Sequence, residues 1–313
     1  MALYMKNTTY AKCGNFGQNS FISASLLLAG LFLAGGLEAA QINRLDVIVA
    51  DSQATIYAVS LQTGQRAIIA QQDKLDRPYD LARNRDGNII VSDTGTLRIV
   101  QVNPLTGQQA VLAEGPALGV PYGLDVDQNN RIYVANSSAI LSVAPATGLI
   151  EVVAQGGLLQ VPLDVAVGSD VTLYVADAVA GVIRIDAASK TQSLLAQGGF
   201  LHSPVGITVD DKHTAYVVDS SGRCIVAVDT QSGAQKLVSM AGIFTTPVGI
   251  ALAPGGTMLV SDPDAFNLDG GILMIGGNGA QSPVVQGSGE LVNPRGIALV
   301  PAFVDATFTA KSK

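Results

Sequence analysis

One sequence unit recurs along most of the chain, and this repeat constrains the fold more than any other feature. Each copy begins with a proline, a variable residue, a glycine or aspartate, and then an aliphatic residue. The opening prolines lie 43, 41, 42, 43 and 47 residues apart, at Pro78, Pro121, Pro162, Pro204, Pro247 and Pro294. A second marker, an Asp or Asn after an aliphatic run, occurs at Asp51, Asp93, Asn136, Asp177, Asp219 and Asp262. Because Asp51 precedes every opening proline, six complete units form only if the two ends of the chain share one.

Each unit predicts four short β-strands. A strand such as Gly206–Val209 follows the opening proline, and a polar turn leads to a second strand such as Ile132–Ala135, which is rich in β-branched and aromatic residues. Two further strands follow, separated by a turn such as Thr106–Gly107. Units of about 40 residues with four strands are typical of propeller blades, because each twisted sheet buries both faces only between neighbours in a ring.

The expected fold is therefore all-β: a six-bladed β-propeller over residues 41–301, with almost no helix. In its last blade, Leu45–Ala70 would supply three strands and Arg295–Val300 the innermost strand. This three-plus-one closure pairs the two end segments of the repeat region in one sheet and leaves no open edge in the ring.

The residues before and after the repeats predict separate segments. Lys6 and Lys12 precede an apolar run, Phe21–Leu37, which ends near Ala39 and Ala40. A basic start, an apolar middle and a small-residue end predict a signal peptide over residues 1–40 and export to the periplasm or the extracellular space. The alternative is an uncleaved N-terminal anchor, although the run is slightly shorter than the about 20 residues of a membrane span. After cleavage no span is expected, and residues 302–313 are predicted to form a C-terminal tail.

Charge and cysteine content exclude several classes of partner. The chain has 18 Lys and Arg against 25 Asp and Glu, a net charge of −7, so no basic surface for nucleic acid is expected. Its two cysteines, Cys13 and Cys224, are too few for a disulfide framework or a Cys-based zinc cluster. Cys224 lies in an apolar run and is interpreted as a small buried side chain.

The repeated phrases resemble NHL repeats. They include Pro-x-Gly-Ile-Ala from Pro247, Tyr-Val-Ala-Asp ending at Asp177, and Asn-Pro-Leu-Thr-Gly ending at Gly107. The similarity covers residues 45–300 and extends, more distantly, to the SMP-30/gluconolactonase and streptogramin lyase groups of six-bladed propellers. The resemblance implies either a binding scaffold or an enzyme, and the fold does not decide between them.

The enzyme interpretation depends on residues that this sequence lacks. The gluconolactonase-like group implies a divalent cation in the channel, held partly by Asp or Asn at the second position of the opening turn. Here the six second-position residues are Tyr79, Tyr122, Leu163, Val205, Val248 and Arg295. None is an oxygen ligand of the kind that Ca²⁺ prefers, and an arginine repels a cation.

A streptogramin lyase-like reaction implies a catalytic histidine, and the chain has two histidines. His213 is expected in a turn on the face opposite the opening prolines, whereas His202 is expected beside the channel mouth, where we interpret it as a loop histidine. The marker acids at the end of the second strands are interpreted as structural, because each is followed by a turn whose backbone N–H groups they can bind. Asp80 and Asp164, which replace the glycine of the opening turn, are expected to make the same kind of local bond.

The six second-position residues predict a binding site, because the first strands of all blades line the propeller axis. Tyr79 and Tyr122 would lie on adjacent blades, with Arg295 beside Tyr79, and Leu163, Val205 and Val248 would complete the mouth. We expect an exported binding scaffold that holds a protein, peptide or glycan on this face. Two alternatives stay open: the tyrosines only plug the channel, or the chain is a hydrolase or lyase with an atypical site.

One acidic loop is a weak candidate for a cation site. The longest repeat holds an insertion with Asp262, Asp264, Asn267 and Asp269, which could surround Ca²⁺. The spacing does not match an EF-hand loop, and no other cofactor is expected.

Overall fold

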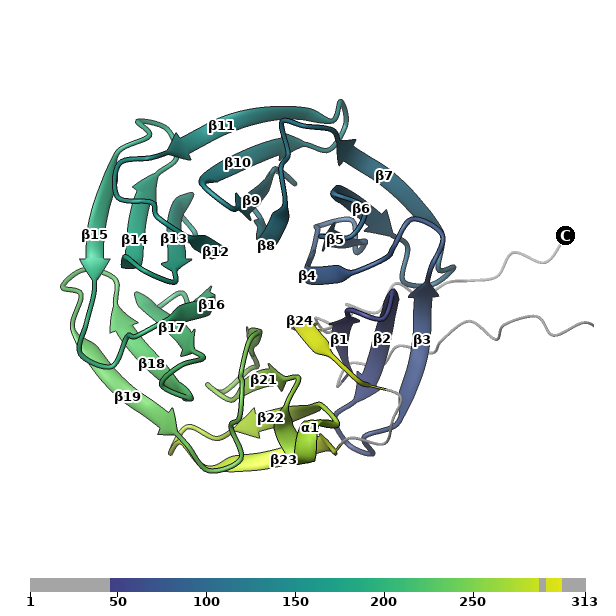
Figure 1. Ribbon diagram of the computed structural model, residues 1–313, viewed down its shortest axis with the longest axis vertical. Coiled ribbons are helices and arrows are strands. Elements are labelled where there is room, and N and C mark those ends of the chain that lie inside the picture. Colours follow the sequence, from purple (N-terminus) through teal and green to yellow (C-terminus); the bar gives the residue numbers. More distant parts are fainter. Residues whose placement is uncertain (1–45, 287–290, 300–313) are drawn as a thin grey trace, which may run out of the picture. The chain divides into compact units, whose positions relative to one another are not determined.

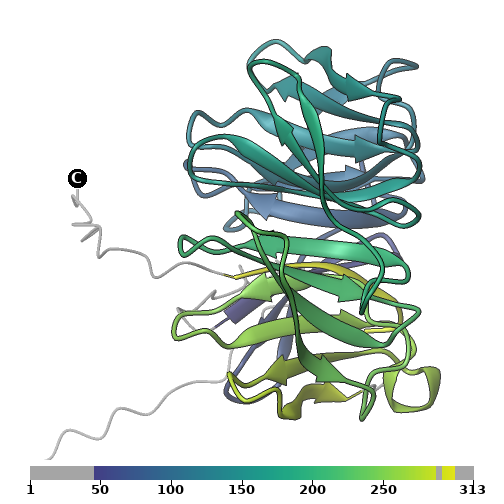
Figure 2. The ribbon, with the colours of Figure 1, turned by 90° about the vertical axis from the view of Figure 1, so that its left-hand side faces the viewer.

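Six four-stranded antiparallel sheets surround a central axis, so the fold is a six-bladed β-propeller, as the repeat predicts (Figure 1). The computed structural model describes residues 46–286 and 291–299, and the predicted signal peptide and tail lie outside them. In the perpendicular view the sheets stand side by side, and the turns between strands gather on two opposite faces (Figure 2). We call the face with the opening prolines the proline face, and the other the opposite face.

The blades follow one another in chain order. The first consists of β4 (Pro78–Arg83), β5 (Ile89–Asp93), β6 (Arg98–Val102) and β7 (Gln109–Glu114). The second consists of β8 (Pro121–Val126), β9 (Ile132–Asn136), β10 (Ala139–Ala144) and β11 (Leu149–Gln155). The third consists of β12 (Pro162–Val167), β13 (Thr172–Asp177), β14 (Gly181–Asp186) and β15 (Gln192–Ala196). The next two consist of β16 (Pro204–Val209), β17 (Thr214–Asp219), β18 (Cys224–Asp229) and β19 (Gln235–Met240); and β20 (Ile250–Leu252), β21 (Met258–Asp262), β22 (Gly271–Ile275) and β23 (Gln281–Gln286).

The sixth blade joins segments from far apart in the sequence. Its strand order is β24–β1–β2–β3, where β24 is Pro294–Leu299, β1 is Asp46–Asp51, β2 is Thr55–Ser60 and β3 is Arg66–Gln71. The register of β24 against β1 pairs Val49 with Ile297 and Asp51 with Pro294. The predicted three-plus-one closure is therefore correct.

One short helical segment interrupts the all-β pattern. It is α1 (Ala265–Leu268), in the insertion after β21, and Phe266 and Asn267 within it have left-handed backbone angles, with φ of 55° and 67°. The Phe266 ring packs against the core between the β16 and β20 blades and over Gly271, where a Cβ atom would collide with it. No helix among residues 46–286 and 291–299 has the length and hydropathy needed to cross a membrane.

The hydrophobic core lies between neighbouring blades. One cluster packs Tyr174 and Val182 of the β12 blade against Ile207, Val217 and Cys224 of the β16 blade. Cys224 is 1% exposed, as expected for a small buried side chain, and burial raises the pKa of its thiol to about 11. A single blade cannot bury its own two faces, so each blade packs against both of its neighbours.

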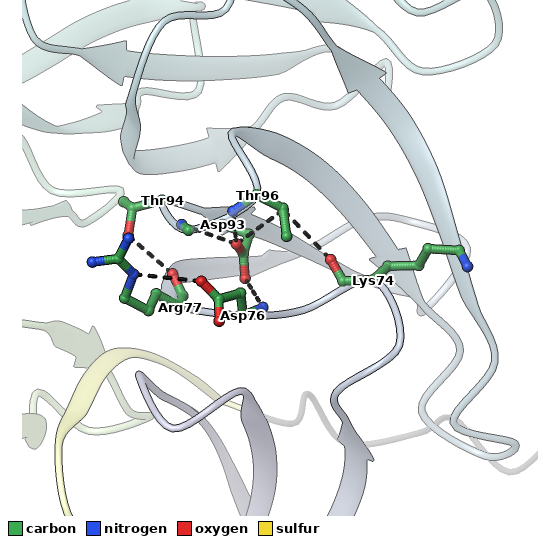
Figure 3. Close-up of polar contacts among 7 residues, drawn as sticks. Lys74, Asp76, Arg77, Asp93, Thr94 and Thr96 are labelled. Atoms are coloured by element: carbon green, nitrogen blue, oxygen red, sulfur yellow. Dashed lines mark hydrogen bonds and ion pairs between the residues drawn. The ribbon is translucent and has the colours of Figure 1, made fainter.

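The marker acids join the loop before the first strand of a blade to the turn after its second strand. Asp93 accepts hydrogen bonds from Gly95 N (3.1 Å) and Thr96 N (2.7 Å) in the turn after β5, and from Asp76 N (2.9 Å) in the loop before β4 (Figure 3). The carboxylates of Asp51, Asp93, Asp177, Asp219 and Asp262 are all 0% exposed. Buried backbone donors are thereby satisfied in each of these blades, so the structural interpretation of these acids is correct.

In the sixth blade the same interaction joins the two ends of the repeat region. Asp51 accepts from Gln53 N (2.9 Å) in the following turn and from Asn293 N (3.0 Å) just before β24. Ser52 N also donates to Asn293 O (3.1 Å). The closure therefore rests on strand pairing, on core contacts and on one buried carboxylate.

Ending the chain after Asn293 is expected to abolish cooperative unfolding, because it removes β24, leaves the β1 edge unpaired and exposes the core that Ile297 covers. Thermal unfolding followed by circular dichroism tests this expectation. The matched control ends after Leu299, keeps β24, and should retain one sharp transition. A folded, monomeric protein without β24 would contradict the role assigned to the closure.

Candidate functional site at the propeller axis

The opening prolines place one side chain per blade next to the axis. In the β4 blade Pro78 pairs with Asp93, and Asp80 pairs with Ser92, so Tyr79 is the extra residue of a β-bulge. Val205 occupies the same position between Pro204 and Gly206. A bulge bends the strand and re-aims the extra side chain. Leu163 lies in the same kind of bulge. Tyr122 and Arg295 lie in wider shifts of register, and Val248 precedes β20.

Three of these residues meet. The rings of Tyr79 and Tyr122 are in edge-to-face contact, with centroids 5.3 Å apart and planes inclined by 66°. The Cζ atom of Arg295 lies 5.9 Å from the centroid of the Tyr79 ring, within the range of a cation–π interaction. All three side chains are partly exposed. We call this group the Tyr–Tyr–Arg cluster.

Two serines hold the backbone of this cluster. Ser92 of β5 donates its hydroxyl to the carbonyl oxygen of Tyr122, and Ser261 of β21 donates to the carbonyl oxygen of Arg295. Both hydroxyls are buried and cross from one blade to the next. Sequence reasoning missed them, although each serine stands where β9, β13 and β17 have Ala or Val.

The other second-position residues lie in the same layer of the ring but differ in environment. Leu163 and Val205 are partly exposed, and Val205 packs against the core cluster between the β16 and β20 blades. Val248 is 7% exposed, and its carbonyl oxygen lies where a Cβ atom on Gly206 would be.

Burial keeps the Tyr79 phenol neutral. Its pKa is raised to about 12, mainly by removal from water; Arg295 opposes the shift, and the charges of Asp164 and Asp80 act in the same direction as burial. The cluster thus presents one neutral hydroxyl-bearing ring against one permanent cation at physiological pH.

A cavity of about 370 Å³ lies inside the ring. It is lined only by inner strands, from the level of Asp80 and Gly249 to the ends of those strands at Arg83 and Leu299. None of the six second-position residues lines it. The cavity therefore begins one or two residues further along the inner strands than the Tyr–Tyr–Arg cluster.

Three carboxylates form one side of this cavity. Asp80 Oδ2 accepts from Leu124 N (2.8 Å), Asp125 Oδ2 from Val167 N (2.8 Å), and Asp164 Oδ2 from Ile207 N (2.8 Å). Each bond crosses from an inner strand to the inner strand of the next blade. The expected local bond is present for Asp164, whose Oδ1 accepts from Val165 N (2.8 Å), but the expectation missed the bonds that reach over the gap between blades. Asp125 was not singled out from the sequence.

Glycines make room for these carboxylates. A Cβ atom on Gly123 would collide with the Asp164 side chain, and one on Gly296 would collide with Asp80. An Asp at the third position of one blade therefore requires a Gly at that position of a neighbour.

The carboxylates resist ionisation. Burial is the main cause that raises the pKa of Asp80 from 3.8 to about 7 and that of Asp125 to about 6. Burial and the charge of Asp80 also raise the pKa of Asp164 well above its usual value. At the end of the cavity, burial lowers the pKa of Arg83, whose Nη2 donates to Gly87 O (3.1 Å).

The two histidines lie where the sequence predicted. His213 is in the turn between β16 and β17, on the opposite face, with φ of 66°. On the proline face His202 N donates to Asp219 Oδ2 (2.5 Å), and its exposed ring nitrogen Nδ1 lies 3.2 Å from Phe200 O. The backbone of His202 therefore belongs to the loop fastened by the marker acid of its blade.

The acidic insertion uses its carboxylates within the fold. Asp262 accepts from Thr245 N (2.7 Å) and Thr246 N (3.0 Å), and Asp264 accepts from the Thr246 hydroxyl (2.6 Å). Asn267 and Asp269 are exposed. No group of three or more His, Cys, Asp or Glu residues is placed to hold a metal ion within residues 46–286 and 291–299.

The cavity carboxylates predict that the protein is more stable at pH 5 than at pH 8. Their folded-state pKa values are raised, so the native state binds more protons than the unfolded state between about pH 4 and 7. Their contribution to stability is complete below that window and is lost as pH rises through about 7. The melting temperature, measured against pH, should fall over this range.

Asp80→Asn should flatten this fall, because it keeps an acceptor for Leu124 N without a titrating charge. Asp229→Asn is the control: Asp229 is exposed and backbone hydrogen bonds lower its pKa, so the slope between pH 5 and 8 should stay unchanged. An Asp80→Asn variant with the slope of the parent would refute the assignment.

Comparisons with known proteins identify the fold. No protein-family model and no curated protein matches the sequence. A chain of the nidogen/laminin complex is similar in structure, with a TM-score of 0.72 and 16% identity over 82% of this chain and 99% of that chain. A streptogramin B lyase gives 0.61 and 17% over 84% and 89%, and virginiamycin B lyase from Staphylococcus aureus gives 0.59 and 16% over 83% and 90%. At such low identity these similarities establish a shared propeller fold.

Proposed function

We propose that this chain is an exported NHL-type β-propeller that acts as a binding scaffold. Its binding site is the proline face around the Tyr–Tyr–Arg cluster, and its ligand is an acidic or polar-aromatic group carried by a protein or peptide. The observation that carries the proposal is the contact between two tyrosine rings and an arginine at the axis. The apolar run at Phe21–Leu37 supports export, and the presence of a structurally similar chain in the nidogen/laminin complex supports a binding role.

The chemistry of the cluster favours recognition. Tyrosine and arginine are the side chains that most often dominate binding energy, since they combine large contact area with polar tips. The Arg295 guanidinium can bind a carboxylate through two parallel hydrogen bonds, while the ring of Tyr122 contacts an aromatic group. Because the serine hydroxyls and the bulges fix the backbone, little conformational entropy is lost on binding.

The alternative is an enzyme of the SMP-30/gluconolactonase or streptogramin lyase kind. In this propeller the layer nearest the proline face presents tyrosine, aliphatic and arginine side chains, and the carboxylates below them bind backbone amides of the next blade. These carboxylates hold neighbouring blades together. We therefore favour binding over catalysis as the role of the partly exposed Tyr–Tyr–Arg cluster.

Selection of a random peptide library on the parent protein, with counter-selection on Arg295→Ala, tests the proposal. We expect peptides with acidic and aromatic residues, whose dissociation constant rises about tenfold in Arg295→Ala and Tyr122→Ala, the loss of one charged or aromatic contact. Melting temperatures should stay close to that of the parent.

Arg184→Ala serves as the control, because it removes the same charge from the exposed side of β14. Its affinity for the selected peptides should equal that of the parent. If Tyr122→Ala and Arg295→Ala lower stability without changing affinity, the rings are plugs of the channel and the proposed site is wrong.

A further inference from the structure

A second cavity lies away from the axis, between the β8–β11 blade and the β12–β15 blade. Its volume is about 600 Å³, within the range of ligand sites, and it opens near the turns of the opposite face. Its lining includes Asp127 and Arg131 of the β8–β9 turn, Asp170 of the β12–β13 turn, and Asp186 and Lys190 at the β14–β15 turn. We call it the inter-blade groove. The proposed function makes no use of it.

Two cationic groups are held in fixed positions in this groove. The Arg131 guanidinium donates from Nη1 to Ser142 Oγ (3.0 Å) and to Glu151 Oε2 (3.1 Å). Lys190 crosses from one blade to the other and donates from Nζ to Val152 O (2.8 Å). Both side chains remain partly or fully exposed, so their other N–H donors can reach a ligand.

Besides Glu151, which pairs with Arg131, three more carboxylates line the groove. Asp127 Oδ1 accepts from Asn129 N (2.7 Å) and Arg131 N (2.9 Å), and Asp170 Oδ1 accepts from Thr172 N (3.0 Å). Asp186 Oδ1 accepts from Ala188 N (3.0 Å) and Ser189 N (2.7 Å). Each turn engages two or three of the about four acceptor positions of its carboxylate, and the rest remain for a ligand.

Backbone hydrogen bonds keep two of the carboxylates charged. They lower the pKa of Asp170 and of Asp186, so both are ionised at neutral pH. By contrast, burial raises the pKa of Tyr133, whose ring lies deep in the lining and stays a neutral phenol.

The groove also has an apolar part. Val152, in the middle of β11, is 46% exposed although it belongs to the lining, and Val171 is partly exposed on the other side. An exposed branched side chain between charged groups offers a surface for the C–H groups of a ligand.

We propose that the inter-blade groove binds a neutral saccharide. Carboxylates only accept hydrogen bonds and the ammonium and guanidinium groups only donate them, whereas a sugar hydroxyl does both. A polyhydroxylated ligand can therefore satisfy both sets of groups at once. An anion would be repelled by the four carboxylates of the lining, and a cationic ligand offers no acceptor to the Arg131 and Lys190 donors, whereas the C–H faces of a sugar ring fit Val152.

Titration calorimetry with neutral linear hexasaccharides of glucose, mannose, galactose and N-acetylglucosamine tests the proposal. At least one should bind the parent protein. Asp170→Asn keeps an acceptor for Thr172 N but removes the charge, and Lys190→Met removes the donor. Each variant should raise the dissociation constant about tenfold, which corresponds to the loss of one charge-assisted hydrogen bond.

Matched controls separate a local effect from a general one. Asp229→Asn changes the β18–β19 turn of the next blade, which is equivalent to the turn of Asp186 and lies outside the groove, and Asp229 Oδ1 accepts there from Gln231 N and Ser232 N. Lys236→Met removes an exposed lysine from β19. Tyr122→Ala changes the proposed protein-binding site alone. All three should bind the saccharide as the parent does.

Three outcomes would overturn the proposal. They are the absence of binding by every hexasaccharide, binding that both groove variants retain in full, and binding of hexalysine in place of a sugar. The last result would identify the groove as a site for a cationic ligand. Failure of the peptide selection at the axis would leave these results unaffected, because the two sites lie on opposite faces.

Discussion

A buried carboxylate between two chain segments is the interaction on which the ring depends. At the end of the second strand of a blade, an Asp with no exposed surface fastens the preceding loop and the following turn. Removing it would leave several buried N–H groups without acceptors, and each such group costs about 1–3 kcal/mol. Since these loops also carry the opening prolines, the same bonds place the bulges that aim Tyr79 and its equivalents at the axis.

The inner strands have no ladder partner on their axial side, and side chains replace the missing bonds. On one half of the ring Asp80, Asp125 and Asp164 bind backbone amides of the next blade. Elsewhere glycines let neighbouring inner strands approach, and Ser261 adds a hydroxyl bond to the carbonyl of Arg295. Because these carboxylates are removed from water, their ionised forms are disfavoured and their pKa values rise.

The repeat was sufficient to predict the blades, their order and the closure, because periodic markers report periodic structure. It also placed Tyr79, Tyr122 and Arg295 together, since equivalent positions of a ring converge on its axis. It could not reveal the cross-blade bonds of Asp80 and Asp164, or the part played by Asp125. Those bonds depend on the distance and twist between adjacent sheets, which no single unit encodes. The inter-blade groove could not be predicted from the sequence for the same reason, since two adjacent blades form it.

The bond from Asn293 to Asp51 has the same form as the bond from Asp76 to Asp93, although the first joins residues 242 positions apart and the second joins residues 17 positions apart. The blade that joins the two end segments is therefore held by the same kind of bond as the β4 blade. A circular permutant, opened in any loop between two blades and joined near β24 and β1, would contain the same strand pairs and the same set of buried carboxylates. Its contacts would differ mainly in sequence separation, so such permutants would change the folding rate through contact order while leaving the native interactions in place.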